Sequence, residues 1–291
     1  MTWLITGGTG QLGIAVSKEL TKRDLSFISC GSKDLDITRG AILSDFIGQL
    51  SPEVIINCAA WTDVDGAESH EELAAGINTQ GAENLTKAAK ACGARLVHIS
   101  TDYVFSGVNQ EPWEVDALRA PQSAYGRTKA DGEDRILNLY PEGSIIIRTA
   151  WLYSPWGKNF AKTMTKLALR SDGEVRVVND QIGQPTSASD LAQQIATLVL
   201  SEPLNGIFHG TNSGEATWFE FAQEIFTCVG ADLSRLIPVS SNQYPQKAIR
   251  PTNSVLSHKD WEKTSITPMR DWRHALTDAM PEIISSVQSL G

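Results

Sequence analysis

Tyr125 and Lys129 are separated by one helical turn within a segment, 125–139, whose apolar residues recur with helical periodicity. Side chains at i and i+4 project from the same face of a helix, so the phenol and the amine are expected side by side. A phenol can donate a proton to a carbonyl oxygen, and a neighbouring ammonium lowers the pKa of that phenol towards the neutral range. The pair is suited to reduction of a keto group, with Tyr125 as proton donor.

A hydroxyl that ends an earlier apolar run can assist this chemistry. Ser100 and Thr101 are adjacent at the end of that run, and adjacent residues of a strand point to opposite faces. We expect Thr101 to polarise the substrate oxygen and Ser100 to lie on the cofactor side. A Tyr-x-x-x-Lys pair alone is frequent by chance, as a surface aromatic beside a solvated lysine. The pair therefore indicates catalysis only where other motifs of the chain support that function.

A glycine turn follows the first apolar run and opens a helix at residue 11. Gly7, Gly10 and Gly13 have the spacing GxxGxxG, and Gln11 and Leu12 lie between the last two. Backbone without Cβ atoms can approach a pyrophosphate, and the helix N-terminus supplies N–H donors. The strand–turn–helix context predicts a dinucleotide site. The alternative is a tight turn that binds nothing.

The second apolar run, 26–30, indicates which dinucleotide binds. A carboxylate at its end would hold a ribose 2′-hydroxyl, but none occurs before Asp34. Ser32 and Lys33 could instead bind a 2′-phosphate. We therefore expect NADPH, with NADH as a possibility; the alternative for Lys33 is a solvated loop charge.

Two further pairs of residues are expected along the cofactor. Asp36 and Ile37 are expected beside the adenine, where a carboxylate can accept a hydrogen bond from the exocyclic amine. Ala59 and Ala60 end the third apolar run, and their small side chains would let the cofactor lie against the strand ends. The alternative for these alanines is ordinary packing.

Five apolar runs alternate with helical segments over the first half of the chain, which predicts an α/β fold with a Rossmann-type, doubly wound parallel sheet. We expect a dinucleotide-binding domain over residues 1–150, which later segments rejoin, and a smaller, mostly substrate-binding domain over 151–291. The expected strands are Trp3–Thr6, Ser26–Cys30, Val54–Ala59, Arg95–Ser100 and Ser144–Arg148. The expected helices are Gln11–Lys22, Ala41–Leu50, Gly81–Ala91 and Tyr125–Leu139.

The motifs together resemble the dTDP-4-dehydrorhamnose reductases, a family of extended short-chain dehydrogenases/reductases that reduces a C4 keto group of a dTDP-sugar with NADPH or NADH. The resemblance covers nearly the whole chain. It implies Thr101, Tyr125 and Lys129 as the catalytic set, Trp61 and Thr62 as further cofactor contacts, and Thr101, Asp102 and Trp151 as contacts to the sugar nucleotide. It is carried by the glycine turn and by the segments 57–65, 100–105, 125–129, 178–186 and 250–254.

Two of the substrate residues have a second interpretation. Trp151 could face the sugar, or it could be a core tryptophan at the domain junction. Arg250 could form charge-assisted hydrogen bonds with a diphosphate, or it could pair with a surface carboxylate.

Three functions are compatible with these motifs. The favoured function is reduction of dTDP-4-dehydro-L-rhamnose to dTDP-L-rhamnose. A 4-epimerase on the same scaffold would keep the same tyrosine, and a related regulatory subunit would keep the cofactor fold without catalysis. Dehydration is disfavoured because Tyr103, not glutamate, follows Thr101 and Asp102.

The composition excludes several partners. The net charge of −9 argues against nucleic acid as a partner, and no long apolar run suggests a membrane span or signal peptide, so we expect a cytoplasmic protein. The four cysteines are scattered, and no metal site is expected. Some family members dimerise through magnesium, but Ala15 replaces a glutamate ligand, so a monomer is expected. His98 is expected to be a hydrogen-bonded core residue.

Overall fold

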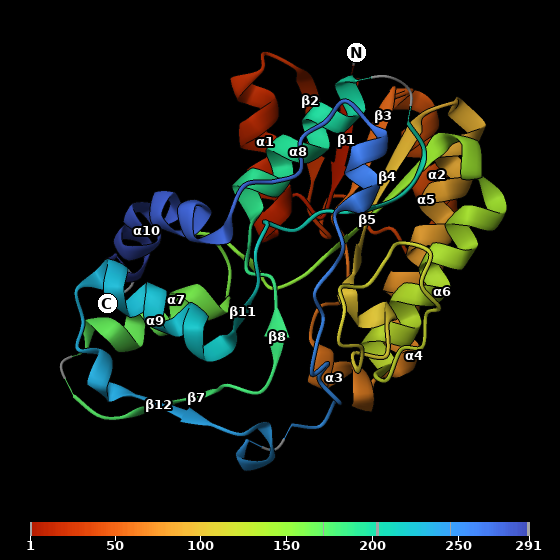
Figure 1. Cartoon of the computed structure of the whole chain (residues 1–291). Coiled ribbons are helices and arrows are strands. Elements are labelled where there is room, and N and C mark those ends of the chain that lie inside the picture. The colour runs from red at the N-terminus through yellow and green to blue at the C-terminus, as the bar shows by residue number, and fades with distance from the viewer. Residues whose placement is uncertain (1, 171, 202–203, 245, 290–291) are drawn as a thin grey trace.

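The computed structural model describes residues 2–170, 172–201, 204–244 and 246–289. A central sheet of six strands, all paired in parallel, forms the upper part of the molecule in Figure 1. In their order across the sheet the strands are β10 (Gly206–His209), β5 (Ser144–Thr149), β4 (Arg95–Thr101), β3 (Val54–Asn57), β1 (Thr2–Thr6) and β2 (Ser26–Cys30). The predicted parallel α/β sheet is confirmed.

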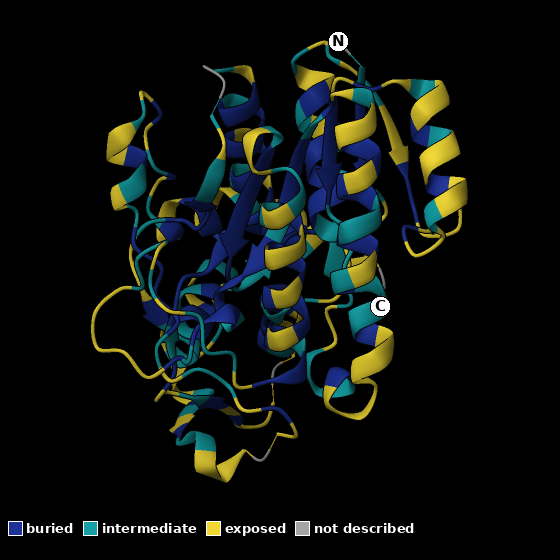
Figure 2. Ribbon diagram, turned by 90° about the vertical axis from the view of Figure 1, so that its right-hand side faces the viewer, coloured by how far each residue is buried: buried dark blue, intermediate teal, exposed yellow. Residues whose placement is uncertain are grey.

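Helices cover both faces of this sheet, so its inner strands are buried (Figure 2). On one face α1 (Gln11–Lys22) packs against α8 (Ala188–Leu200), and their apolar side chains join one hydrophobic core. The other face carries α2 (Gly40–Leu50), α5 (Ala82–Cys92) and α6 (Ala124–Leu139), which surround a second core. The doubly wound arrangement explains why the strands are continuously apolar in sequence.

The strand order reverses next to β1, because β2 and β3 lie on opposite sides of it. In open α/β sheets a ligand-binding crevice forms outside the carboxyl ends of the strands at such a point. The glycine turn that follows β1 lies at this edge, as do the ends of β3, β4 and β5. The candidate catalytic residues on β4 therefore meet the turn in space.

A third core lies in the lower part of the molecule in Figure 1, where α7 (Phe160–Leu169), α9 (Trp218–Val229) and α10 (Trp272–Gln288) pack together. A two-stranded parallel sheet of β7 (Val175–Val178) and β12 (Leu236–Val239) borders it. By contrast, β10 and α8 follow residue 150 in the chain but belong to the central sheet and its covering layer. The C-terminal half is therefore shared between the two parts of the molecule.

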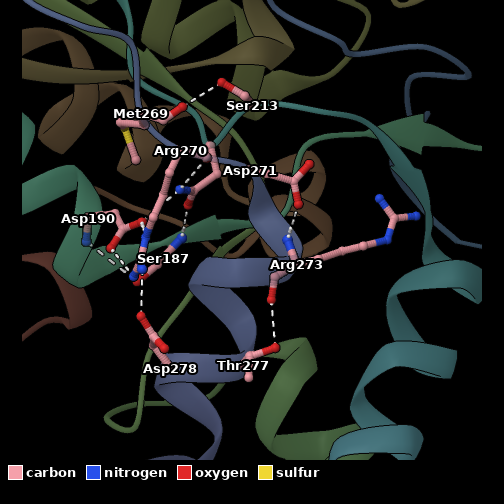
Figure 3. A network of polar contacts seen from close by, with 10 residues as sticks. Ser187, Asp190, Ser213, Met269, Arg270, Asp271, Arg273, Thr277 and Asp278 are labelled. Carbon is pink, nitrogen blue, oxygen red and sulfur yellow. Dashed lines mark hydrogen bonds and ion pairs between the residues drawn. The ribbon is translucent and has the colours of Figure 1, made fainter.

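Arg270 joins the C-terminal helix to α8 (Figure 3). Its Nε and Nη2 atoms donate to the carboxylate of Asp190 on α8 at 2.8 and 3.0 Å. Its Nη1 atom donates to Asp278 on α10 at 2.5 Å. These ion pairs connect the layer that covers the central sheet with the third core.

The boundaries of the four predicted helices agree with the structure to within one residue, but a segment before α5 was not predicted. A π-helical segment, η1 (Gly76–Gly81), precedes α5 and carries the buried Asn78. The Asn78 carboxamide accepts from the backbone N–H of Trp61 and donates to the Thr128 hydroxyl, contacts that apolar periodicity does not encode. The carboxylate-rich stretch beginning at Trp61 leads into α3 (Val64–Ser69). Among the described residues, no helix is long and apolar enough to cross a membrane.

Candidate active site

A cavity of about 810 Å³ lies at the carboxyl edge of the central sheet. Of the predicted catalytic and substrate residues, the catalytic set Thr101, Tyr125 and Lys129 lines it, and so do Asp102 and Trp151. The predicted cofactor residues that line it are Gly7, Gly10, Gln11, Leu12, Ser32, Asp36, Ile37, Ala59, Ala60, Thr62 and Ser100. The cavity thus collects residues that are far apart in the sequence.

The glycine turn forms a close-packed cradle at one end of the cavity. Gly7 has φ +67°, and a Cβ atom there would lie 2.5 Å from the backbone nitrogen of Ala59. A Cβ atom at Gly13 would lie 2.4 Å from the Gly7 carbonyl oxygen, so Gly13 serves the packing of the turn and does not line the cavity. No side chain caps the N-terminus of α1, so N–H groups there are available to an anionic ligand.

The loop after β2 borders the same cavity. Asp36 and Ile37 line it, and Asp36 Oδ1 accepts from the Thr38 backbone N–H at 2.9 Å and from the Thr38 hydroxyl at 2.8 Å. These hydrogen bonds hold the pKa of Asp36 below its ordinary value, so the carboxylate stays charged. Ser32 also lines the cavity, whereas Lys33 is exposed and does not. A role for Lys33 in binding a 2′-phosphate stays a prediction.

Tyr125 is the second residue of α6, whose N-terminus is capped by Ser123. Burial raises the pKa of Tyr125 to about 12, and a hydrogen bond with Thr101 offsets only part of that rise. In this cavity the pKa of the phenol is therefore raised, because burial outweighs the other effects. The lowering expected from the sequence depends on a charged Lys129 together with a bound nicotinamide, and it stays a prediction. The phenol keeps its proton at neutral pH, as a proton donor must.

The Lys129 side chain is almost fully buried beneath the cavity floor. Its Nζ atom donates to the Ile99 carbonyl oxygen at 2.6 Å and lies 3.0 Å from His98 Nε2. Burial lowers the pKa of Lys129 to about 8. Lys129 lines the same cavity as Tyr125, one helical turn away, as predicted.

Ser100 and Thr101 point in different directions, as the strand geometry predicts. The Ser100 hydroxyl donates to Glu133 on α6 at 2.5 Å, while the Thr101 hydroxyl donates to Asp102 Oδ1 at 2.9 Å. Burial raises the pKa of Asp102 to about 6. Thr101 therefore lies between a buried carboxyl group and the phenol of Tyr125.

Trp151 follows β5 in the left-handed region, with φ +44°. Its ring stacks on that of Trp218 on α9, with centroids 3.5 Å apart and an interplanar angle of 8°. The indole is half-buried and also lines the cavity. The two interpretations from the sequence therefore coexist, because one ring packs against the third core and borders the cavity.

Two other predicted residues lie outside the cavity lining. The Trp61 indole N–H donates to the Asp63 carbonyl oxygen at 2.8 Å. Arg250 pairs with the Asp65 carboxylate at 2.7 Å and donates to Gln246 Oε1 at 2.7 Å. The carboxylate partner expected as the alternative for Arg250 is thus present.

Sequence reasoning missed several lining residues. Tyr103 lines the cavity, and its ring meets that of Tyr125 edge-on, with centroids 5.6 Å apart. It lies inside segment 100–105, one of those that carry the family resemblance, so the sequence did offer a signal for it. Cys58 falls inside segment 57–65, which offered the same kind of signal. Lys158 brings a cation to the lining, although its loop showed no motif. In the described part of the chain, no three His, Cys, Asp or Glu side chains form a metal-binding group.

One cavity brings together a glycine cradle, a threonine at a strand end and a Tyr-x-x-x-Lys pair. This combination defines a nicotinamide-dependent oxidoreductase of the short-chain type. The model of the family described as RmlD substrate binding domain matches residues 1–284. The chain belongs to this family.

Proteins of known name are similar to this chain over nearly its whole length. A dTDP-4-dehydrorhamnose reductase of Streptomyces griseus is 41% identical over 97% of this chain and 93% of its own. A dTDP-4-keto-6-deoxy-D-glucose reductase of Streptomyces niveus is 42% identical over 96% of both chains. The crystal structure of a Bacillus anthracis dTDP-4-dehydrorhamnose reductase in complex with NADP superposes with a TM-score of 0.93, at 37% identity, over 97% of this chain and 99% of that one.

Proposed function

We propose that this protein reduces the C4 keto group of dTDP-4-dehydro-L-rhamnose to give dTDP-L-rhamnose, with NADPH as the preferred reductant. The observation that carries the proposal is the meeting of Thr101, Tyr125 and Lys129 in one cavity with the glycine cradle. The names of the relatives supply the substrate class.

The residues present fit a dinucleotide. Gly7 lines the cavity and leaves no room for a side chain between the turn and Ala59, so the turn packs directly against the end of β3. The uncapped N-terminus of α1 suits a pyrophosphate, and Asp36 is placed to accept from an adenine amine. When bound, the reduced nicotinamide supplies the hydride that adds to C4 of the sugar.

Tyr125 donates the proton that the sugar oxygen takes up as the hydride adds to carbon. Its high pKa in the ligand-free cavity keeps the phenol protonated until the substrate arrives. Thr101 orients the carbonyl when its single hydroxyl hydrogen turns from Asp102, its partner in this structure, to the substrate oxygen. Lys129 holds the nicotinamide ribose and, once charged, favours the phenolate that forms on Tyr125.

Asp102 and Trp151 are the proposed contacts of the sugar nucleotide, because both line the cavity beside Thr101. The third core, which carries Trp218, is the proposed substrate-binding part of the chain, mostly from residues 151–291. Arg250 binds the diphosphate only if the ligand displaces it from Asp65. We further propose that the protein works as a cytoplasmic monomer.

The test is a stoichiometric assay. Purified protein is mixed with dTDP-4-dehydro-L-rhamnose and either NADPH or NADH, and loss of reduced-nicotinamide absorbance is compared with product formed. A reductase consumes one cofactor per product. A 4-epimerase would form product without net loss, and a regulatory subunit would do neither; either result contradicts the proposal.

The same assay separates the two substrate classes named among the relatives. dTDP-4-keto-6-deoxy-D-glucose replaces the rhamnose precursor in a parallel reaction. A larger kcat/KM for dTDP-4-dehydro-L-rhamnose is expected, and the reverse order would assign the protein to the other substrate.

A further inference from the structure

A chain of hydrogen bonds runs beneath the cavity floor from β1 to α6. The Thr6 hydroxyl donates to Asn57 Oδ1 at 2.8 Å, and Asn57 Nδ2 lies 2.9 Å from His98 Nδ1. His98 Nε2 lies 3.0 Å from Lys129 Nζ. The four side chains are at most 1% exposed, so water cannot replace any of these contacts. Of these four side chains, only Lys129 has a role in the proposed reaction.

The orientation of the Asn57 amide is fixed by the main chain. The backbone N–H of Ala59 donates to Asn57 Oδ1 at 3.1 Å, and a backbone N–H can only donate. Rotation of the amide by half a turn would place its NH₂ group against the Ala59 N–H, so that two donors would face each other. The Asn57 NH₂ group therefore faces His98.

This orientation selects the tautomer of His98. Because Asn57 Nδ2 donates, His98 Nδ1 must accept and carries no hydrogen. Burial lowers the pKa of His98 well below its ordinary value, so the ring is neutral and its single N–H is on Nε2. That N–H points at Lys129.

An Nε2–H donor requires an acceptor, and only the neutral amine of Lys129 has a lone pair to offer. An ammonium at this position would oppose two donors across 3.0 Å in a buried site. The amine can still donate to the Ile99 carbonyl oxygen while it accepts from His98.

The other groups around Lys129 leave its pKa well below the ordinary value. Glu133, on the next turn of α6, raises the pKa of Lys129, but Glu133 already pairs with Arg148 and Arg119. The Cys58 thiol is protonated at neutral pH, since burial raises its pKa to about 12, and Tyr125 is protonated for the same reason.

We propose that Asn57 and His98 are positioning residues that favour the neutral amine of Lys129 over its ammonium form in the ligand-free site, relative to an ordinary lysine. Cofactor binding then supplies ribose oxygens as acceptors and is accompanied by proton uptake at Lys129. The second statement rests on the proposed function, because it requires a cofactor ribose at Lys129. The first statement concerns the free protein alone.

The first statement is tested by nitrogen NMR of ligand-free protein labelled in its histidines, with the His98 signals identified by their loss in His98→Gln. The expected result is hydrogen on Nε2, none on Nδ1, and no titration of the ring through the neutral range. Hydrogen on Nδ1 would overturn the proposal, whether or not the protein proves to be a reductase.

The second statement is tested by calorimetry of NADPH binding at about pH 8, near the pKa of Lys129, in buffers that differ in ionisation enthalpy. Half of the free protein carries the neutral amine at that pH, so uptake of about half a proton per cofactor is expected. Failure to bind NADPH would contradict the proposed function and leave the NMR result intact.

Two variants identify the source of this proton. In Asn57→Asp the carboxylate accepts from Nδ1–H, so the tautomer inverts and Nε2 can accept from an ammonium. In His98→Gln the side-chain oxygen can accept from the ammonium directly. Both variants should lose most of the uptake, while His209→Gln, which replaces a buried histidine bonded to the Ser257 carbonyl, should keep it. Unchanged uptake in the first two variants would overturn the proposal.

Discussion

Glu133 and Arg148 form a two-point ion pair inside the protein. Arg148 Nε donates to Oε1 at 2.9 Å and Nη2 donates to Oε2 at 2.7 Å, with side chains 0% and 1% exposed. Glu133 lies one turn beyond Lys129 on α6, and Arg148 belongs to β5. The pair therefore fixes the helix that carries the catalytic side chains against the sheet.

Glu133→Gln should lower the free energy of unfolding by about 3–5 kcal/mol, because it leaves a buried guanidinium without its counter-charge. Denaturant unfolding measures the loss. The matched control is Glu71→Gln, which breaks an exposed pair with Arg127 and should cost less than about 1 kcal/mol. Equal losses in the two variants would show that the buried pair does not anchor α6.

Tyr125→Phe should reduce kcat by about 100-fold or more, because the proton donor is removed while the ring is kept. The Kd for NADPH, measured by calorimetry, should change little. Tyr140→Phe, at the far end of α6, is the control and should retain full turnover. Unchanged turnover in Tyr125→Phe would refute the assignment of the donor.

Much of the fold could be predicted from local patterns. Continuous apolar runs separated by helical periodicity fix a buried parallel sheet, and the glycine spacing indicates where the first crossover turns. The return of β10 and α8 to the central sheet is set by long-range packing with β5 and α1. No short segment encodes that packing.

The chemistry of the site was less accessible to sequence reasoning than its location. Motifs placed Thr101, Tyr125 and Lys129 together, and His98 was expected to be a hydrogen-bonded core residue. Its contact with Lys129 depends on the register of β4 against α6, and its tautomer depends on an amide on the neighbouring strand β3. The raised pKa of Tyr125 likewise comes from burial, which motifs do not report.

Lys129→Met should change how stability depends on pH. The pKa of Lys129 is lowered by burial from its ordinary 10.5 to about 8, so between these values the unfolded chain binds more protons than the folded one. The free energy of unfolding of the native protein therefore rises with pH across that window, relative to the variant, by at most about 3 kcal/mol. Urea unfolding of both proteins over a pH series measures this difference.

The control for this experiment is Lys22→Met, at the solvent-exposed end of α1. Its stability should stay parallel to that of the native protein across the same window. If Lys129→Met also stays parallel to the native protein, Lys129 is fully charged in the folded state, and the account of its burial fails.

Asp102→Asn should stabilise the protein at neutral pH. Burial raises the pKa of Asp102 from 3.8 to about 6, although side-chain hydrogen bonds with Ser254 and Thr101 favour the carboxylate. Between these values the folded protein binds more protons than the unfolded chain, so the free energy of unfolding falls as pH rises from about 4 to 6. Above pH 6 the full penalty, at most about 3 kcal/mol, is present.

Asparagine carries no charge at any pH, so Asp102→Asn should lose this part of the pH dependence and show a higher midpoint of thermal unfolding at neutral pH. The exposed Asp45→Asn on α2 should leave both properties unchanged. Because Asp102 also fixes the Thr101 hydroxyl, the stabilised variant should have a lower kcat/KM. A variant that is no more stable than the native protein would show that the Asp102 carboxylate is not penalised by its burial.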